Sequence, residues 1–323
     1  KKVTITGAVS AVGGEELLKS PTASVANSLQ GKLPGVQSVQ YSGIPGGDEP
    51  VLRVRGVGSI NSAEPLVLVD GVERGFSQLD PNEIQDISIL KDASATAVFG
   101  VRGANGVILV TTKRGQTGKP SVSFTASAGM QQITHFIETV DAYTYATAFN
   151  GAQISDGLSK DQLKFTDEAI KHFKDHDMPY VYPDTNWFDY IMKNTAWQQQ
   201  YNISVSGGTD KAKYFVSVGY MNQDGLFKTF NTGDHNNFSF NRYNYRANLD
   251  LQLTKISSLS LSVGGRVQNR TEIGDGESNL FTYLQDATPF SSYGIDEFGR
   301  HIKTDPALVA DYGRDGLETF YNL

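Results

Sequence analysis

A strict two-residue alternation of apolar and polar side chains after Pro120 is the feature that most constrains how this 323-residue chain can fold. Its clearest instance is residues 243–253, where Tyr, Tyr, Ala, Leu, Leu and Leu alternate with Asn, Arg, Asn, Asp and Gln. Successive side chains of a strand point to opposite faces, so this segment is predicted to be a strand with one apolar and one polar face. The same period recurs in four further segments, which span residues 121–129, 201–207, 214–220 and 259–268.

Alternation alone leaves two architectures open. A soluble β-sandwich exposes the polar face of its strands, whereas a membrane barrel turns the apolar face to lipid and the polar face to a wet lumen. The connections favour the barrel, because the short links 208–213 and 254–258 alternate with long links at 133–197, at 222–241 and from 271 onwards. Five strands cannot close a barrel, and an open edge in lipid leaves backbone groups unpaired. The sequence therefore predicts the first wall strands of a longer barrel.

Composition and charge narrow the function classes. The mean hydropathy is −0.32, and no apolar run approaches the roughly 18 residues that a spanning helix needs. A net charge of −7 without a basic face argues against a nucleic-acid partner. The absence of cysteine rules out disulfides and thiolate metal sites. The chain shows no signal peptide, but a secreted protein would have lost one, so this absence decides nothing.

The first part of the chain, residues 1–118, has the mixed pattern of a compact α/β domain. Apolar residues at helical spacing in 24–33 end at Pro34-Gly35, a strong helix breaker. A short turn of helix is expected at 93–98. Strands are expected at 51–55, 66–69, 84–90 and 106–112.

Long motifs in this first part point to a family. They read SLQGKLPGVQ, SGIPGG, LRVRGVGSINSAEPLVLVDGV and LDPNEIQDISILKDASATAVFGVRGANGVILVTTKRG, and all lie between residues 28 and 115. This stretch closely resembles the plug domain of SusC-like (SusC/RagA-type) TonB-dependent transporters. The resemblance is dense over about residues 3–118 and continues more loosely into the strand segment YNISVSGGTDKAKYFVSVGYMNQDG.

The resemblance implies a fold and a domain division. The fold is a transmembrane β-barrel of about 22 strands when complete, with an N-terminal α/β plug domain inside its lumen. Residues 1–118 would be the plug, and residues 119–323 the N-terminal portion of the barrel with long extracellular loops. In the family the Ton box lies just before the position of Lys1, so we expect this sequence to lack it.

The resemblance also implies a function. It is TonB-dependent import of a nutrient across the outer membrane of a Gram-negative, Bacteroidetes-like cell, with oligosaccharides as the first expectation for the cargo. The implied partners are a SusD-like lipoprotein lid, the TonB–ExbB–ExbD energising complex and outer-membrane lipid, with a dimer of transporter–lipoprotein pairs as a further expectation. Oligopeptide import within the same family is the first alternative. A soluble β-sandwich binding module is the alternative from another class.

Candidate site residues lie in the plug. Arg53 and Arg55, two apart on one strand face, are expected to make polar contacts with carboxylates of the lumen wall, the alternative being a solvated strand face. Loops at the plug apices are where related transporters meet ligand, and aromatic and charged side chains suit sugar stacking and hydroxyl hydrogen bonds. The candidates for such substrate-facing residues are Arg55, Asn61, Glu73, Arg74, Phe76, Phe99 and Arg102, although each of them could equally serve only to shape its loop.

The chain offers little for catalysis or metal binding. Gly56-Val57-Gly58 lacks the third glycine of a dinucleotide fingerprint. His172 and His176 are four apart, as in a zinc helix, but the intervening glutamate is missing and an exposed helix face fits better. The acidic residues around Gly276 match only part of a calcium loop. We therefore expect no catalytic residue, no cofactor and no metal.

Overall fold

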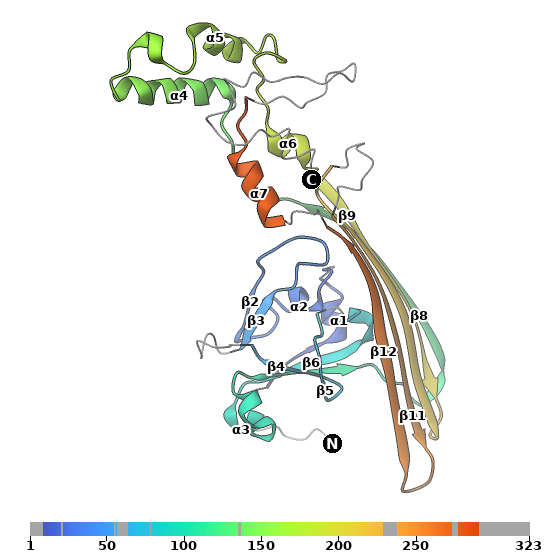
Figure 1. Cartoon of the computed structure of the whole chain (residues 1–323). Coiled ribbons are helices and arrows are strands. Elements are labelled where there is room, and N and C mark those ends of the chain that lie inside the picture. The colour runs from blue at the N-terminus through green and yellow to red at the C-terminus, as the bar shows by residue number, and fades with distance from the viewer. Residues whose placement is uncertain are drawn as a thin grey trace. The chain divides into compact units, whose positions relative to one another are not determined.

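The computed structural model describes residues 9–20, 22–54, 56, 64–77, 79–134, 137–228, 238–272 and 277–290 (Figure 1). The chain divides into two compact units. The plug–wall unit comprises residues 1–131, 196–225 and 238–270, and the loop unit comprises residues 132–195, 226–237 and 271–323.

The plug is built on a five-stranded sheet in the order β1–β6–β7–β4–β5. Its strands are β1 (Val9–Gly13), β4 (Leu66–Val69), β5 (Val72–Glu73), β6 (Ile84–Leu90) and β7 (Val107–Thr112). Strands β4 and β7 are parallel, and the other neighbours are antiparallel. A separate hairpin pairs β2 (Val36–Val39) with β3 (Val51–Val54). The short helices are α1 (Gly14–Leu17), α2 (Val25–Ser28), η1 (Pro81–Glu83), α3 (Ala93–Thr96) and η2 (Ala97–Gly103).

The core of the plug lies between this sheet and the first two helices. Figure 1 shows α1 and α2 on one face of the sheet and α3 on the other. The inward side chains of β6, Ile84, Ile87 and Ile89, are fully buried in this core. Gly14 lets α1 approach β6, because a Cβ at this position would overlap the carbonyl oxygen of Ile84. The strands predicted at 66–69 and 84–90 are confirmed, whereas β1, β2 and the two-residue β5 were not foreseen.

The wall is a single sheet of five long strands in which each strand is hydrogen-bonded to the next along the chain. They are β8 (Gly118–Gln132), β9 (Thr195–Gly208), β10 (Ala212–Asp224), β11 (Ser239–Gln252) and β12 (Ser258–Thr271). In the register of the central strands Val216 lies opposite Val205 and Ala247. The five predicted strands are confirmed, and each is longer than its alternating segment.

One face of the wall is apolar and exposed. Phe124, Ile203, Val218 and Leu261 are each about half exposed or more. The tyrosines of this face form a row across neighbouring strands, with ring centroids 6.5 Å apart for Tyr201 and Tyr220 and 4.9 Å apart for Tyr220 and Tyr243. An outward apolar band with aromatic residues near its edge is the pattern of a lipid-facing barrel surface.

The loop unit is mainly helical. Its elements are α4 (Ala142–Ser155), η3 (Lys160–Gln162), α5 (Asp167–Asp175), α6 (Trp187–Ile191) and α7 (Glu277–Asp286). Its aromatic core centres on Phe165, whose ring lies 5.0 Å from that of Phe290 and 6.3 Å from that of Phe173. None of the helices in the described ranges is long and apolar enough to cross a membrane.

Candidate functional site between plug and wall

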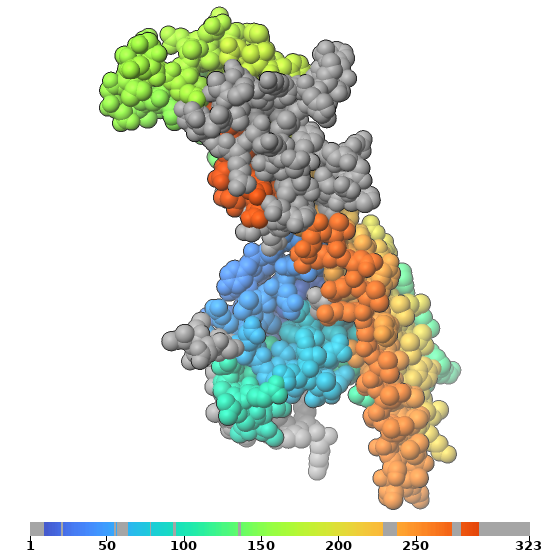
Figure 2. Space-filling view, in the orientation of Figure 1, coloured from blue at the N-terminus to red at the C-terminus, as the bar shows by residue number. Residues whose placement is uncertain are grey.

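The polar face of the wall is buried although its residues are of the kind that normally contact water. Lumen-facing side chains of β9, β10 and β11 are less than a tenth exposed because the plug covers them. They are Gln198, Gln200, Asn202, Ser217, Gln223, Arg242, Asn244, Arg246 and Asn248. Figure 2 shows plug side chains (blue to teal) meeting those of β12 (orange), and a Cβ built on Gly47 of the plug would lie 2.7 Å from Arg270 Nη2 of β12. Buried polar groups need hydrogen-bond partners, and for several of these residues the plug supplies them.

Arg246 makes the central contact of this interface. Its side chain is 3% exposed, and its Nε donates to Oε2 of Glu83, 2.8 Å away at the end of η1. Its Nη1 lies 3.7 Å from Oδ2 of Asp70, in the turn after β4. The wall leaves room for the guanidinium at Gly264 of β12, where a Cβ would lie 3.2 Å from it. One wall arginine thus contacts two separate segments of the plug.

A second chain of hydrogen bonds extends from Asp70. Both the N–H and the hydroxyl of Thr112 donate to the Asp70 carboxylate, at 3.0 and 2.7 Å. Nδ2 of Asn248, two residues after Arg246 on the same face of β11, donates to the Thr112 hydroxyl at 2.9 Å and to the Lys113 carbonyl at 2.7 Å. The end of β7 is therefore attached to the wall through side chains rather than through backbone pairing.

Asp80 is held in a socket on the wall. It caps η1 by accepting from the N–H of Asn82 at 2.9 Å, which leaves its oxygens free to accept two further bonds. These come from Nε2 of Gln200 at 3.2 Å and Nδ2 of Asn202 at 2.7 Å, both on β9. Gly219 of β10 completes the socket, because a Cβ there would overlap Oδ2 of Asp80. The absence of a side chain at Gly219 allows the plug to seat this deeply.

A small dry contact accompanies the polar one. Ala23 of the plug packs with Met221 and Phe240 of the wall, and all three are buried. Nη1 of Arg242 donates to the Ala23 carbonyl at 3.0 Å, and its guanidinium lies 5.9 Å from the centre of the Phe240 ring. Gly46 has φ +69 and lies against the same ring, so a side chain there would be doubly disfavoured.

Burial is the largest cause of the pKa shifts of two plug carboxyls, Glu83 and Asp48. It raises the pKa of Glu83 above its usual value, an effect that the hydrogen bond and charge of Arg246 partly offset and that the nearby Asp80 reinforces. Burial likewise raises the pKa of Asp48, against the opposing hydrogen bonds from its own backbone and from Asn27. Charges buried in this way add little net stability, but removing one partner of such a contact is costly.

The predicted plug–wall contacts can be compared with this geometry. Arg53 lies in β3 opposite Gln37 and is half-buried, and within the described ranges it forms no ion pair with a wall carboxylate. Arg55 lies outside the described residues, so its pairing stays a prediction. The central contacts have the opposite polarity to the one expected, because the carboxylates belong to the plug and the arginines to the wall. Arg114 is the exception, with its Nη1 2.8 Å from Oδ1 of Asp250 on β11.

Among the candidate substrate-facing residues that the structure describes, only Glu73 and Arg102 are in contact with each other through their side chains. Glu73 forms an exposed ion pair with Arg102, and Arg74 is exposed. Phe99 and Arg102 belong to η2, which directly follows α3, and Figure 1 shows α3 toward the end of the wall with the short turns. Phe76 is 3% exposed in the plug core, so its ring is not available for stacking. Asn61, like Arg55, lies outside the described residues.

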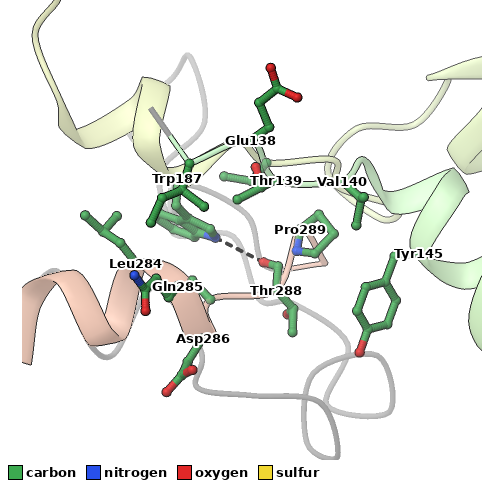
Figure 3. Close-up of a pocket in the computed structure, with 13 residues that line it drawn as sticks. Glu138, Thr139, Val140, Tyr145, Trp187, Leu284, Gln285, Asp286, Thr288 and Pro289 are labelled. Atoms are coloured by element: carbon green, nitrogen blue, oxygen red, sulfur yellow. Dashed lines mark hydrogen bonds between the residues drawn. The ribbon is translucent and has the colours of Figure 1, made fainter. Parts of the chain in front are cut away.

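The loop unit contains a cavity of about 430 Å³ between α4, α6 and α7 (Figure 3). Nε1 of the buried Trp187 donates to the Thr288 carbonyl at 3.1 Å, and burial raises the pKa of the nearby Tyr145 hydroxyl. The carboxylates of Glu138 and Asp286 point away from the indole in Figure 3. The cavity therefore lacks a convergent set of charged groups.

The two histidines of the loop unit, His172 and His176, each contact a different set of neighbouring side chains. His172 stacks on Tyr182 at 4.6 Å, and its Nδ1 lies 2.6 Å from Oδ1 of Asp177. His176 instead faces Asp184, with 3.5 Å between Nδ1 and Oδ2. In the part of the chain that the structure describes, no group of three or more His, Cys, Asp or Glu side chains is placed to hold a metal ion.

Sequence reasoning missed the residues that form the interface, namely Asp70, Asp80, Glu83 and Arg246. A signal for the last was present, since an arginine in the middle of an alternating strand needs a polar environment. The plug partners carried no such signal, because carboxylates in turns are ordinarily solvated.

An α/β domain seated against the polar face of a wall with an apolar, exposed outer face defines a plugged barrel. Residues 1–107 match the TonB-dependent receptor plug domain family. TonB-dependent receptors P26 and P3 of Formosa agariphila are 36% and 34% identical to this chain, over 79% and 96% of it but 24% and 29% of their own lengths. The TonB-dependent receptor SusC of Bacteroides thetaiotaomicron is 33% identical over 72% of this chain and 22% of its own length. The chain thus spans about a quarter of the length of these relatives.

Solved structures agree with this assignment. The RagAB peptide importer in its closed-closed state superposes with a TM-score of 0.69 at 28% identity, over 83% of this chain and 31% of that one. A ferric enterobactin receptor from Pseudomonas aeruginosa shares the fold, with a TM-score of 0.51 at 13% identity over 87% of this chain and 36% of that one. The chain belongs to the SusC-type TonB-dependent receptors and carries the plug and a part of the transmembrane β-barrel. This family consists of transporters rather than enzymes.

Proposed function

We propose that this chain is the plug and first wall strands of an outer-membrane importer, which admits a nutrient when the plug moves against the wall. The observation that carries the proposal is the buried polar interface around Arg246, Asp70 and Asp80. A dry interface of the same area would cost about 25 cal/mol per Å² to open. Hydrogen-bonded groups instead exchange their partners for water, at a net cost of roughly 1 kcal/mol per neutral bond and roughly 1.5–3 kcal/mol per bond to a charged group. Such an interface holds the plug and still permits its displacement.

The cargo we propose is an oligosaccharide, in line with the likeness to SusC. An oligopeptide is the second candidate, and the likeness to the RagAB peptide importer favours it. We further propose a SusD-like surface lipoprotein as lid, energy from a TonB–ExbB–ExbD complex, a location in the outer membrane of a Bacteroidetes-like cell, and pairing of two transporter–lipoprotein units. The division into a plug at 1–118 and a wall from 119 onward is part of the same proposal.

Contact with the cargo is proposed for the exposed candidates of the plug loops. Arg74 meets this requirement in the present structure, and Arg55 and Asn61 remain candidates on sequence grounds. Glu73 and Arg102 would first have to leave their mutual ion pair. Phe76 would have to leave the core, which makes it the weakest of the set.

Plug movement can be tested by a reversible tether in the intact receptor, to which this chain contributes no cysteine of its own. Gly47→Cys places a thiol on the plug, and Arg270→Cys places one on β12. The two thiols are separated by about the length of an arginine side chain, because the Arg270 guanidinium reaches Gly47. A cleavable bismaleimide across this pair should stop import, and reduction of the linker should restore it. Each single-cysteine variant treated in the same way is the control. Import that continues with the tether intact would refute plug movement.

The cargo is decided by a separate measurement. A strain that lacks the receptor gene should fail to grow when the transported oligosaccharide is the sole carbon source, and should grow normally on its monosaccharides. A defect confined to growth on oligopeptides would replace the first cargo by the second.

A further inference from the structure

Two buried oxygen atoms at the plug–wall interface lack a hydrogen-bond donor among the described residues. One is Oε1 of Glu83, whose other oxygen accepts from Arg246. The second is Oδ1 of Asn248, whose amide nitrogen already donates to Thr112 and Lys113. Both residues are 1% exposed. Two buried acceptors without a donor are unfavourable, since an unsatisfied buried group costs roughly 1–3 kcal/mol.

The charges at this place do not balance if every group is ionised. The plug brings Asp48, Asp70, Asp80 and Glu83, whereas the wall brings the guanidiniums of Arg242, Arg246 and Arg266. Arginine stays protonated in proteins, so the mismatch of one charge can be removed only at a carboxyl. Asp70 and Asp80 each accept bonds from several donors, Asp48 accepts from Asn27 and from its own backbone, and Glu83 accepts one. Glu83 is therefore the carboxyl that gains least from being ionised.

A proton on Glu83 would remove the surplus negative charge and one of the two buried acceptors that lack a donor. A protonated carboxyl turns one acceptor oxygen into an O–H donor, while its second oxygen still accepts. Asp70 would then be the counter-ion of Arg246, at 3.7 Å. Proteins do hold carboxyls neutral at pH 7 where the surroundings are dry. The pKa shift of Glu83 described above has the same direction.

We propose that Glu83 binds a proton while the plug is seated, accepting from Arg246 through Oε2 and carrying the proton on Oε1, and releases it to water when the plug leaves the wall. Seating then takes up one proton, and unseating returns the carboxylate and a hydrated proton. The inference rests on the proposed function only in assuming that the plug can leave the wall. Its consequence is that raising the pH loosens the plug, by at most tenfold per pH unit for one proton.

Glu83→Gln in the intact, detergent-solubilised receptor tests this. Glutamine keeps the shape of the glutamic acid side chain. Its carbonyl oxygen can accept from Arg246, and its amide N–H takes the place of the acid O–H. The readout is the hydrogen-exchange protection factor of the Lys113 amide, which donates to the Glu83 carbonyl at 2.8 Å. In the wild type, protection should fall as pH rises. In Glu83→Gln it should equal the low-pH wild-type value and no longer change with pH. Glu73→Gln, at an exposed carboxyl of the same domain, should behave as wild type.

Infrared spectroscopy gives a second readout that does not depend on seating. The seated wild type should show the carbonyl stretch of a buried carboxylic acid, absent in Glu83→Gln and shifted in Glu83→Asp. Loss of protection by tenfold or more in Glu83→Gln at every pH would overturn the proposal, because it is the result for a broken ion pair. The proposal would also be overturned if no carboxylic-acid carbonyl band in the wild-type spectrum were lost in Glu83→Gln. A plug that proves immobile in the tether experiment would refute the proposed function and leave the acid band in place.

Discussion

Gly219 determines how deeply the plug sits, and Gly219→Ala tests that reasoning most directly. The added Cβ would overlap Oδ2 of Asp80 and lie 3.2 Å from Nδ2 of Asn202. Asp80 is 2% exposed and has a short side chain, so its carboxylate can retreat only by leaving the wall. The change should therefore break the bonds that Gln200 and Asn202 donate. The main chain of β10 is paired on both sides and cannot yield.

The magnitude follows from the two bonds lost. A hydrogen bond to a charged group contributes roughly 1.5–3 kcal/mol, so the loss of two should weaken seating by about 3–6 kcal/mol. Because every 1.4 kcal/mol is about tenfold in an equilibrium constant, the unseated population should rise on the order of a hundred- to ten-thousandfold. Hydrogen exchange of peptides covering η1 and the end of β7 measures this change in the intact receptor. Heat-modifiable gel mobility shows in parallel that the barrel has formed.

Gly129→Ala is the matched control. Gly129 lies in β8 of the same wall, and a Cβ built there meets nothing within 4 Å. It should leave plug protection unchanged. If Gly219→Ala also left η1 and β7 as protected as in the wild type, the socket would not position the plug, and the proposed role of Gly219 would have to be withdrawn.

Three further outcomes are expected. Arg246→Met should destabilise the seated plug by roughly 3–5 kcal/mol, because it leaves Asp70 buried without a counter-ion, and plug proteolysis should accelerate accordingly. Ile203→Arg, in mid-strand on the apolar face, should lower the stability of the barrel by about 2–4 kcal/mol. Leu253→Arg, just past the end of β11, should lower it by at most about 1 kcal/mol. Equal unfolding midpoints for the two variants would contradict a lipid-facing wall. Asp141→Ala should cost about 1 kcal/mol in the loop unit, because Oδ1 of Asp141 caps α4 at the Thr144 N–H. Hydrogen bonds from Thr144 lower the pKa of Asp141, so the cap stabilises α4 at neutral pH. This stabilisation is lost as the pH falls through the lowered pKa, and hydrogen exchange of the α4 amides measured as a function of pH would show the loss.

Several elements follow from sequence alone because their signals are local. The wall strands are recognisable since period two depends only on neighbouring residues, as residues 243–253 show. The apolar run at β4 and the alternation in β6 are of the same kind. Helix α4 lacked such a signal, because its apolar residues are spread around the helix rather than along one stripe. Strand β5 is too short for any period to be visible.

Sequence by itself thus determined that this chain has a two-faced wall, an α/β plug and membership of a transporter family. The position of Arg246 in the middle of an alternating strand was visible as well, but its importance was missed. Only the tertiary structure decided that Arg246 meets Glu83 and Asp70, that Asp80 lies against Gly219, and that Phe76 faces the core. The physical reason is the distance along the sequence between the residues that interact. Periodicity is set by adjacent residues, whereas the partner of a buried charge is set by how two domains distant in sequence pack together.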